Sequence, residues 1–331
     1  MNKIIRVAIG SERINNRCYE LVFRAFTDPV MFELCTPIIY GSKNDVEALH
    51  KALGIIPSLN AIKKAEDAQE SKLNIMDIAQ EKSLQAAFED CQNGSTDATV
   101  VIGIPPTSMS PAILVNERLR IFAPDTPWTK ESLEEQAKVF KTILRRDFML
   151  SNPRIAVLAI NPKKETTAPK ADTPLPTPWG AEEMEIILPA IENLKNENMS
   201  VFGPYDAEHF VSERQYEQFD GIMTFTKEQG NTIFQDVIDE QGTTLIAGQP
   251  FVITVSPSLG KTNLSQEGEE NAIGQSLRNA LYLATDVVRH RRNYDLPYRN
   301  PLPKLYHEKK DESEKIRFAI PKAKTEKKKE E

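Results

Sequence analysis

Histidine and cysteine are scarce in this sequence. Its 331 residues include only four histidines and three cysteines. No two cysteines have the spacing of a metal-binding pair, and their odd number indicates reduced thiols of a cytoplasmic protein. The histidines lie far apart among polar neighbours, so a surface or packing role is the favoured interpretation for each: His50, His209, His290 and His307.

Long apolar runs and a positive net charge are also absent. No apolar segment approaches the ~20 residues that cross a membrane. The N-terminus passes into a strand-like segment without the apolar core of a signal peptide. The net charge is −7, which argues against nucleic acid or an anionic membrane surface as a partner. We therefore expect a cytoplasmic protein that binds neither.

The apolar residues follow the pattern of an α/β protein. Short continuous apolar runs that end in Gly or Pro turns are typical of buried parallel strands, and apolar residues at i, i+3, i+4 spacing indicate helices. Expected strands are 4–9, 73–75, 97–104, 119–122, 154–160, 220–225, 243–247 and 251–255. Expected helices are 19–26, 42–53 with Ser42 as cap, 84–91, 129–148 with Thr129 as cap, 187–194 and 272–286. An extended arm is expected from His290 onward.

Four polar residues follow or end two of these strands. Lys227 and Glu228 lie in a polar segment, 226–230, that is expected to be a turn, while Thr254 and Ser256 end the strand 251–255. Ligands of open α/β sheets bind beyond the carboxyl ends of the strands. These four residues are therefore the first candidates for a binding site.

The stretch 220–260 resembles the 4-hydroxythreonine-4-phosphate dehydrogenase family of pyridoxal-phosphate synthesis. The matching frame consists of Gln229-Gly230, Gly248, Pro250, Thr254, Ser256-Pro257 and Gly260. Further matches lie at 35–42, 180–183 and 202–205, and the resemblance covers about residues 4–305, with gaps near 105–118 and 163–180. It implies a two-domain α/β, isopropylmalate-dehydrogenase-like fold with mostly parallel sheets, an interdomain cleft and a homodimer.

The resemblance also suggests a division of the chain. Residues 1–110 and 245–300 are expected to form the first α/β domain, and residues 111–244 the second. A proline-rich insert, 163–180, interrupts the second domain. Residues 301–331 form a charged C-terminal arm whose end is expected to be disordered.

The reactive residues of the family do not match. The resemblance implies a divalent metal held by three histidines drawn from two subunits, and Asp125, Lys163 and Lys227 stand at those positions. A lysine has no lone pair at neutral pH and its charge repels a cation, so we expect no divalent metal. Asp125 before Thr126-Pro127 is interpreted first as a turn residue and only second as a ligand.

The substrate contacts implied by the family are also replaced. Its lysine, asparagine and arginine fall near Gln235, Thr244 and Ile253. Loss of the arginine removes a bidentate phosphate clamp. The family's Gly-His-Thr-Glu segment, which holds the substrate phosphate and hydroxyls, has no counterpart between residues 105 and 119.

Two candidate ligand sites remain open. Asn161, Lys163 and Lys227 follow strand ends, and two lysines facing one cleft would favour a small anion, unless each turns to solvent. Gly260-Lys261-Thr262 lacks the earlier glycine of a phosphate loop, since Val255 stands there. By resemblance this loop contacts the adenine end of NAD, with Asn271 nearby; the alternative is a plain surface loop.

The preferred interpretation is a non-catalytic relative of the family that binds a small anionic or nucleotide ligand or a partner. One alternative is an active NAD-dependent oxidoreductase with metal-independent chemistry. Another is a structural protein whose arm and proline-rich insert dock a partner.

Overall fold

The computed structural model describes residues 4–54, 58–104, 112–116, 119–123, 128–160, 179–237, 243–256 and 270–299. The chain divides into two units, residues 1–294 and 295–331, and the fold described below is that of the first unit. The boundary between two α/β domains near residues 110 and 245 stays a prediction. Most of the proline-rich insert and the C-terminal arm 301–331 lie outside the described residues.

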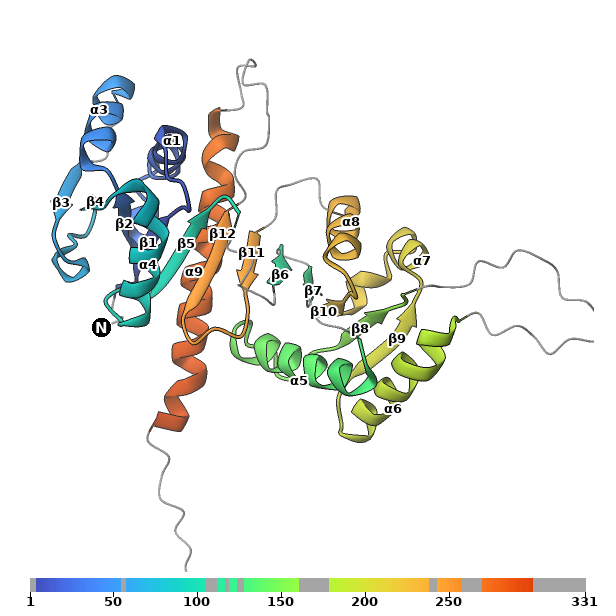
Figure 1. Cartoon of the computed structure of the whole chain (residues 1–331). Helices are drawn as coiled ribbons and strands as arrows, with labels where there is room; N and C mark the ends of the chain where they lie inside the picture. The colour runs from blue at the N-terminus through green and yellow to red at the C-terminus, as the bar shows by residue number, and fades with distance from the viewer. Residues whose placement is uncertain are drawn as a thin grey trace, which may run out of the picture. The chain divides into compact units, whose positions relative to one another are not determined.

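The strands form a single mixed sheet in the order β3-β4-β2-β1-β5-β12-β11-β6-β7-β10-β8-β9 (Figure 1). The strands are β1 (Arg6–Gly10), β2 (Thr36–Gly41), β3 (Leu59–Ile62), β4 (Leu73–Asp77), β5 (Ala98–Ile102), β6 (Ala112–Val115), β7 (Arg120–Ala123), β8 (Ile155–Leu158), β9 (Val201–Tyr205), β10 (Gly221–Met223), β11 (Thr243–Ile246) and β12 (Val252–Ser256).

Neighbouring strands run parallel except at three adjoining pairs: β12–β11, β11–β6 and β6–β7. The mostly parallel α/β fold is therefore as predicted. The parallel orientation expected for the strand at 243–247 is wrong, because β11 runs antiparallel to both of its neighbours. A continuous apolar run reports burial on both faces of a sheet, and it carries no information about direction.

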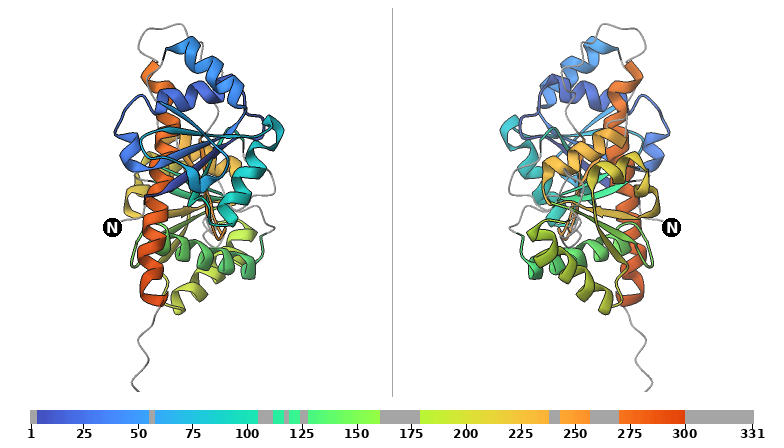
Figure 2. Two further views of the ribbon diagram at one scale, coloured as in Figure 1. Left: turned by 90° about the vertical axis from the view of Figure 1, so that its left-hand side faces the viewer. Right: turned by 90° about the vertical axis from the view of Figure 1, so that its right-hand side faces the viewer.

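Helices cover both faces of this sheet (Figures 1 and 2). They are α1 (Asn16–Ala25), α2 (Met31–Leu34), α3 (Lys43–Leu53), α4 (Ser83–Gln92), α5 (Lys130–Arg146), α6 (Leu188–Asn196), α7 (Ala207–Ser212), α8 (Lys227–Val237) and α9 (Glu270–Arg299). Among the described residues, no helix is long and apolar enough to cross a membrane.

The two predicted helix caps are confirmed. The Ser42 hydroxyl accepts a hydrogen bond from the Asp45 amide at 3.4 Å. Thr129 and Ser132 bond each other's backbone amides in a capping box at the start of α5. Such caps satisfy amides that have no partner inside the helix.

Two local expectations are wrong. The extended conformation expected from His290 is wrong as far as Arg299, because α9 continues to that residue and includes Pro297. The segment 226–230, expected as a turn, begins helix α8 at Lys227. Composition indicated a break in both places, and tertiary packing overrides such weak local preferences.

Two ion pairs attach α9 to the sheet and to α5. Both guanidinium contacts from Arg291 to the Asp147 carboxylate measure 2.7 Å, and both side chains are buried. Arg292 contacts Asp97, before β5, at 2.5 Å. A bidentate pair fixes orientation as well as distance, so α9 is held rigidly against this face of the sheet.

Candidate functional site

Three neighbouring strands end together at one edge of the sheet. β10 lies between β7 and β8 and is parallel to both, with Met223 opposite Phe122 and opposite Val157. The carboxyl ends of β7, β10 and β8 therefore lie at a common edge, here called the β7–β10–β8 edge. Asp125, Asn161 and Lys163 lie outside the described residues.

Lys227 and Glu228 are the first two residues of α8 and are exposed. The helix begins there because Thr226 caps it. The Thr226 hydroxyl accepts a hydrogen bond from the Gln229 amide at 3.0 Å, and its carbonyl accepts one from the Gly230 amide. Lys227 thus occupies a defined position directly beyond β10.

Gln229 joins the ends of two strands. Its side-chain Nε2 donates to the Ala159 carbonyl oxygen, after β8, at 2.9 Å. Its Oε1 accepts from the Phe225 amide, after β10, at 3.0 Å. The Trp128 indole N–H donates to the Phe225 carbonyl at 2.8 Å. The two rings pack edge-on, with 4.4 Å between their centroids. The edge is therefore rigid around Lys227.

Gly230 allows α8 to approach the sheet closely. A Cβ atom at this position would lie 3.2 Å from the Thr224 hydroxyl and 3.3 Å from a methyl group of Ile121. These distances are shorter than ordinary van der Waals contact. Close packing of α8 on the sheet therefore explains the glycine of the Gln229-Gly230 pair, which is part of the match to the family.

A buried carboxylate supports the end of β8. Glu183 is fully buried in a π-helical turn, Glu183–Ile187, and its Oε1 accepts from the Ile160 amide at 2.8 Å. Sequence reasoning assigned no role to Glu183, Trp128 or the Gln229 side chain. For Glu183 and Gln229 the available signal was the match of the segments 180–183 and 229–230 to the family; Trp128 had no such signal.

Thr254 and Ser256 take a different position. Both are fully buried and face α9: Thr254 donates to the Ala280 carbonyl at 2.9 Å, and the Ser256 and Ser276 hydroxyls lie 2.6 Å apart. β12 also runs against the direction of β10, so their carboxyl ends do not share an edge. The structure does not bring these two residues together with Lys227 and Glu228.

The candidate nucleotide-binding residues come from the segment after β12 and from the start of α9. Gly260, Lys261 and Thr262 lie outside the described residues. Asn271 is the second residue of α9, and only its backbone belongs to the described part of the structure.

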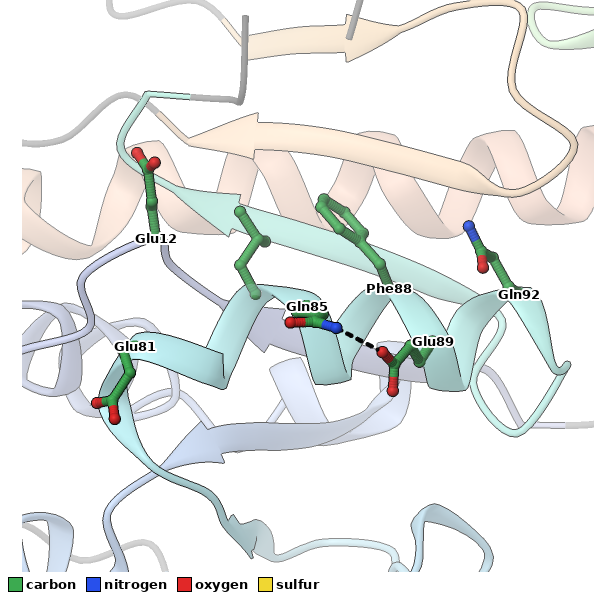
Figure 3. Close-up of a pocket in the computed structure, with 7 residues that line it drawn as sticks. Glu12, Glu81, Gln85, Phe88, Glu89 and Gln92 are labelled. Carbon is green, nitrogen blue, oxygen red and sulfur yellow. Dashed lines mark hydrogen bonds between the residues drawn. The ribbon is translucent and has the colours of Figure 1, made fainter. Parts of the chain in front are cut away.

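An acidic hollow of about 410 Å³ lies beside α4 (Figure 3). Three carboxylates line it: Glu12, which follows β1, Glu81, just before α4, and Glu89, on α4. The described residues that line it include no lysine or arginine. Glu89 accepts a hydrogen bond from Gln85 at 2.9 Å. Carboxylates repel a phosphate group, so this hollow is unsuited to a pyrophosphate.

The metal implied by the family does not fit the residues at its positions. One carboxylate and two ammonium groups are a poor donor set for a divalent ion, and Lys227 is fixed at the helix start in place of an imidazole. Within the described ranges, no three His, Cys, Asp or Glu side chains cluster as metal ligands.

Known proteins share this scaffold. Residues 125–284 match the family described as pyridoxal phosphate biosynthetic protein PdxA. The 4-hydroxythreonine-4-phosphate dehydrogenase of Bacteroides thetaiotaomicron is 30% identical over 364 residues, which cover 95% of this chain and 97% of that protein.

Solved structures agree in fold. A 4-hydroxythreonine-4-phosphate dehydrogenase from Burkholderia phymatum has a TM-score of 0.63 at 17% identity and covers 86% of this chain and 99% of its own. A putative one from Salmonella typhimurium has a TM-score of 0.64 at 17% identity, with 86% and 100% covered.

Proposed function

The chain belongs to the 4-hydroxythreonine-4-phosphate dehydrogenase family, and we propose that it keeps the scaffold of that family without its reaction. In this proposal the protein is a non-catalytic relative that binds a small anionic or nucleotide ligand, or a protein partner. NAD is the nucleotide that the resemblance favours.

The observation that carries the proposal is Lys227. It stands where the family has a metal-binding histidine, and Thr226, Gln229 and Gly230 hold its position as a frame around it. An ammonium group donates hydrogen bonds and accepts none, so it does not substitute for imidazole. The frame is preserved while the reactive group is replaced.

The substrate side supports the same proposal. Ile253, where the family has arginine, is fully buried in an apolar cluster with Val101, Ile246 and Val255. A buried aliphatic side chain offers no hydrogen bond to a phosphate. The acidic hollow beside α4 adds negative charge rather than a replacement cation.

A direct assay tests the proposal. Purified protein is given NAD and 4-hydroxythreonine-4-phosphate, with and without zinc or magnesium, and NADH is measured. A lost metal costs several kcal/mol and each lost charged hydrogen bond ~1.5–3 kcal/mol. At about 1.4 kcal/mol per tenfold, we expect a rate lower by roughly a million-fold than that of an active relative.

The Bacteroides thetaiotaomicron relative assayed in parallel is the matched positive control. The triple variant with Asp125→His, Lys163→His and Lys227→His should gain metal affinity without gaining turnover, because the Gly-His-Thr-Glu segment is still missing. Turnover by the parent protein within a hundred-fold of the control would instead identify an active, metal-independent oxidoreductase.

A further inference from the structure

A groove of about 570 Å³ lies between α9 and the β6–β7 hairpin. It is lined by one side of α9, by Arg120 on β7 and by Asp147 and Phe148 at the end of α5. Adjacent strand residues point to opposite faces. Ile121 packs in the apolar cluster beneath α7 and α8, so Arg120 faces the other side of the sheet. The groove is therefore separate from the β7–β10–β8 edge.

Arg120 is the charged centre of the groove. Its guanidinium lies over the Phe148 ring, 4.5 Å from the centroid. Its Nε is buried and donates no hydrogen bond within the described part of the chain. Burial lowers the pKa of Arg120, while the charge of Asp220 acts in the opposite direction. A partly desolvated cation without an ion-pair partner favours an incoming anion.

The carboxylates along the groove already have partners. Both oxygens of Asp147 are bound by Arg291 at 2.7 Å. Asp286 lies 3.4 Å from Arg289. Each of these two carboxylates is neutralised by its own arginine partner. Arg120 forms no ion pair with any carboxylate that the structure describes. Arg120 is therefore the one lysine or arginine among the described residues that line the groove, and it is left without an ion-pair partner there.

The other walls suit the body of an organic ligand. Phe148, Leu283 and Val287 supply apolar surface, and Gln275, Asn279 and Tyr282 supply amide and phenol groups along the helix. The volume lies within the range of ligand pockets, ~300–1,000 Å³, which combine apolar walls with a few polar groups. An anion without an apolar part would leave these walls unused.

We propose that this groove binds a small organic anion, a carboxylate or phosphate monoester with an apolar body. The Arg120 guanidinium binds the anionic head through two N–H groups, and the body packs against Phe148 and Val287. The inference goes beyond the proposed function, because it rests on neither the family's substrate nor the β7–β10–β8 edge.

Calorimetric titration of the full chain with benzoate and with phenyl phosphate tests the proposal. We expect at least one of them to bind with a dissociation constant at or below ~1 mM. Arg120→Met should weaken binding by at least about 10- to 100-fold, since the loss of even one charged hydrogen bond has an effect of this size. Arg120→Lys should retain part of the affinity, because it keeps the charge and loses the bidentate geometry.

Arg214→Met is the matched control. Arg214 is exposed and paired with Glu217, and neither residue lines the groove, so its removal should leave affinity within about twofold. Phe148→Leu gives a second test that leaves the charge in place, and it should weaken the aromatic probes and spare any binding of inorganic phosphate. The proposal is overturned if neither probe binds, if Arg120→Met binds as tightly as the parent, or if inorganic phosphate binds as well as phenyl phosphate.

Discussion

The side-chain amide of Gln229 donates a 2.9 Å hydrogen bond to the carbonyl oxygen of Ala159. With the second bond, from the Phe225 amide to its Oε1, one residue holds the ends of β8 and β10 together. The Ala159 carbonyl and the Phe225 amide have no other hydrogen-bond partner among the described residues. The Gln229 side chain therefore takes the place of the backbone hydrogen bonds that join the two strands up to this point.

Replacing Gln229 should therefore destabilise the fold. Gln229→Ala leaves a part-buried amide and carbonyl without partners, and we expect the free energy of unfolding to fall by about 1–3 kcal/mol. Urea denaturation measures this. Gln85→Ala, which removes an exposed glutamine bonded to Glu89, is the control and should change stability by less than about 0.5 kcal/mol. Equal losses in the two variants would contradict the role assigned to Gln229.

The protein should not carry a tightly bound divalent metal. Asp125, Lys163 and Lys227 supply one ligand of the required chemistry. Elemental analysis after purification without chelators should give well under one metal ion per chain. Stoichiometric zinc that disappears in Lys227→Ala or Asp125→Ala would show that the site still binds metal.

We propose that the chain forms a homodimer. The scaffold segments 35–42 and 202–205 that resemble the dimeric family are intact, and the replaced metal ligands need not disturb an apolar interface. Sedimentation velocity at micromolar concentration should give the mass of a dimer. A monomer under these conditions would count against this proposal.

Stability should fall in alkaline solution. Burial raises the pKa of the Cys35 thiol to about 12. Burial and the hydrogen bond to Asp90 raise the pKa of Tyr40. The folded state then holds protons that the unfolded state has lost. The stabilisation is complete below pH ~8 and decreases above about pH 9 for Cys35 and above about pH 10 for Tyr40, by up to about 1.4 kcal/mol per pH unit for each group.

Urea midpoints at pH 8 and pH 10 check this dependence. The midpoint should be lower at pH 10, and Cys35→Ala should reduce the difference. A thiol reagent at pH 8 gives an independent readout: the half-buried Cys18 should react while Cys35 and Cys91 stay protected until the chain unfolds. A midpoint that does not change with pH would contradict the assigned cause.

Local signals predicted much of the fold. Ser42 and Thr129 were identified as caps because capping depends on residues within one turn. β9 is not among the expected strands, since Gly203 and Pro204 are weak strand formers, yet pairing with β8 makes it a strand. β6 was not predicted at all: its four residues acquire partners only from β7 and from β11, far along the chain.

The candidate site was predictable only in part. Lys227 was found because it directly follows an apolar strand. The roles of Gln229 and Trp128 depend on contacts with Ala159 and Phe225, 70 and 97 residues away, which no local pattern records. Thr254 was misplaced beside Lys227 because the sequence does not report that β11 reverses the sheet's direction. Arg120 was not a candidate for a binding site, because it lies within an otherwise apolar strand segment.

The position of β11 and β12 bears on how the chain is made. In the sheet these two strands lie between β5 and β6, although they are the last two strands along the described part of the chain. Until residue 256 has left the ribosome, β5 and β6 each present an open edge, and an unpaired edge readily recruits other strands. Stalled or truncated chains should therefore aggregate, and the newly made protein should depend on chaperones until its last two strands join its two halves.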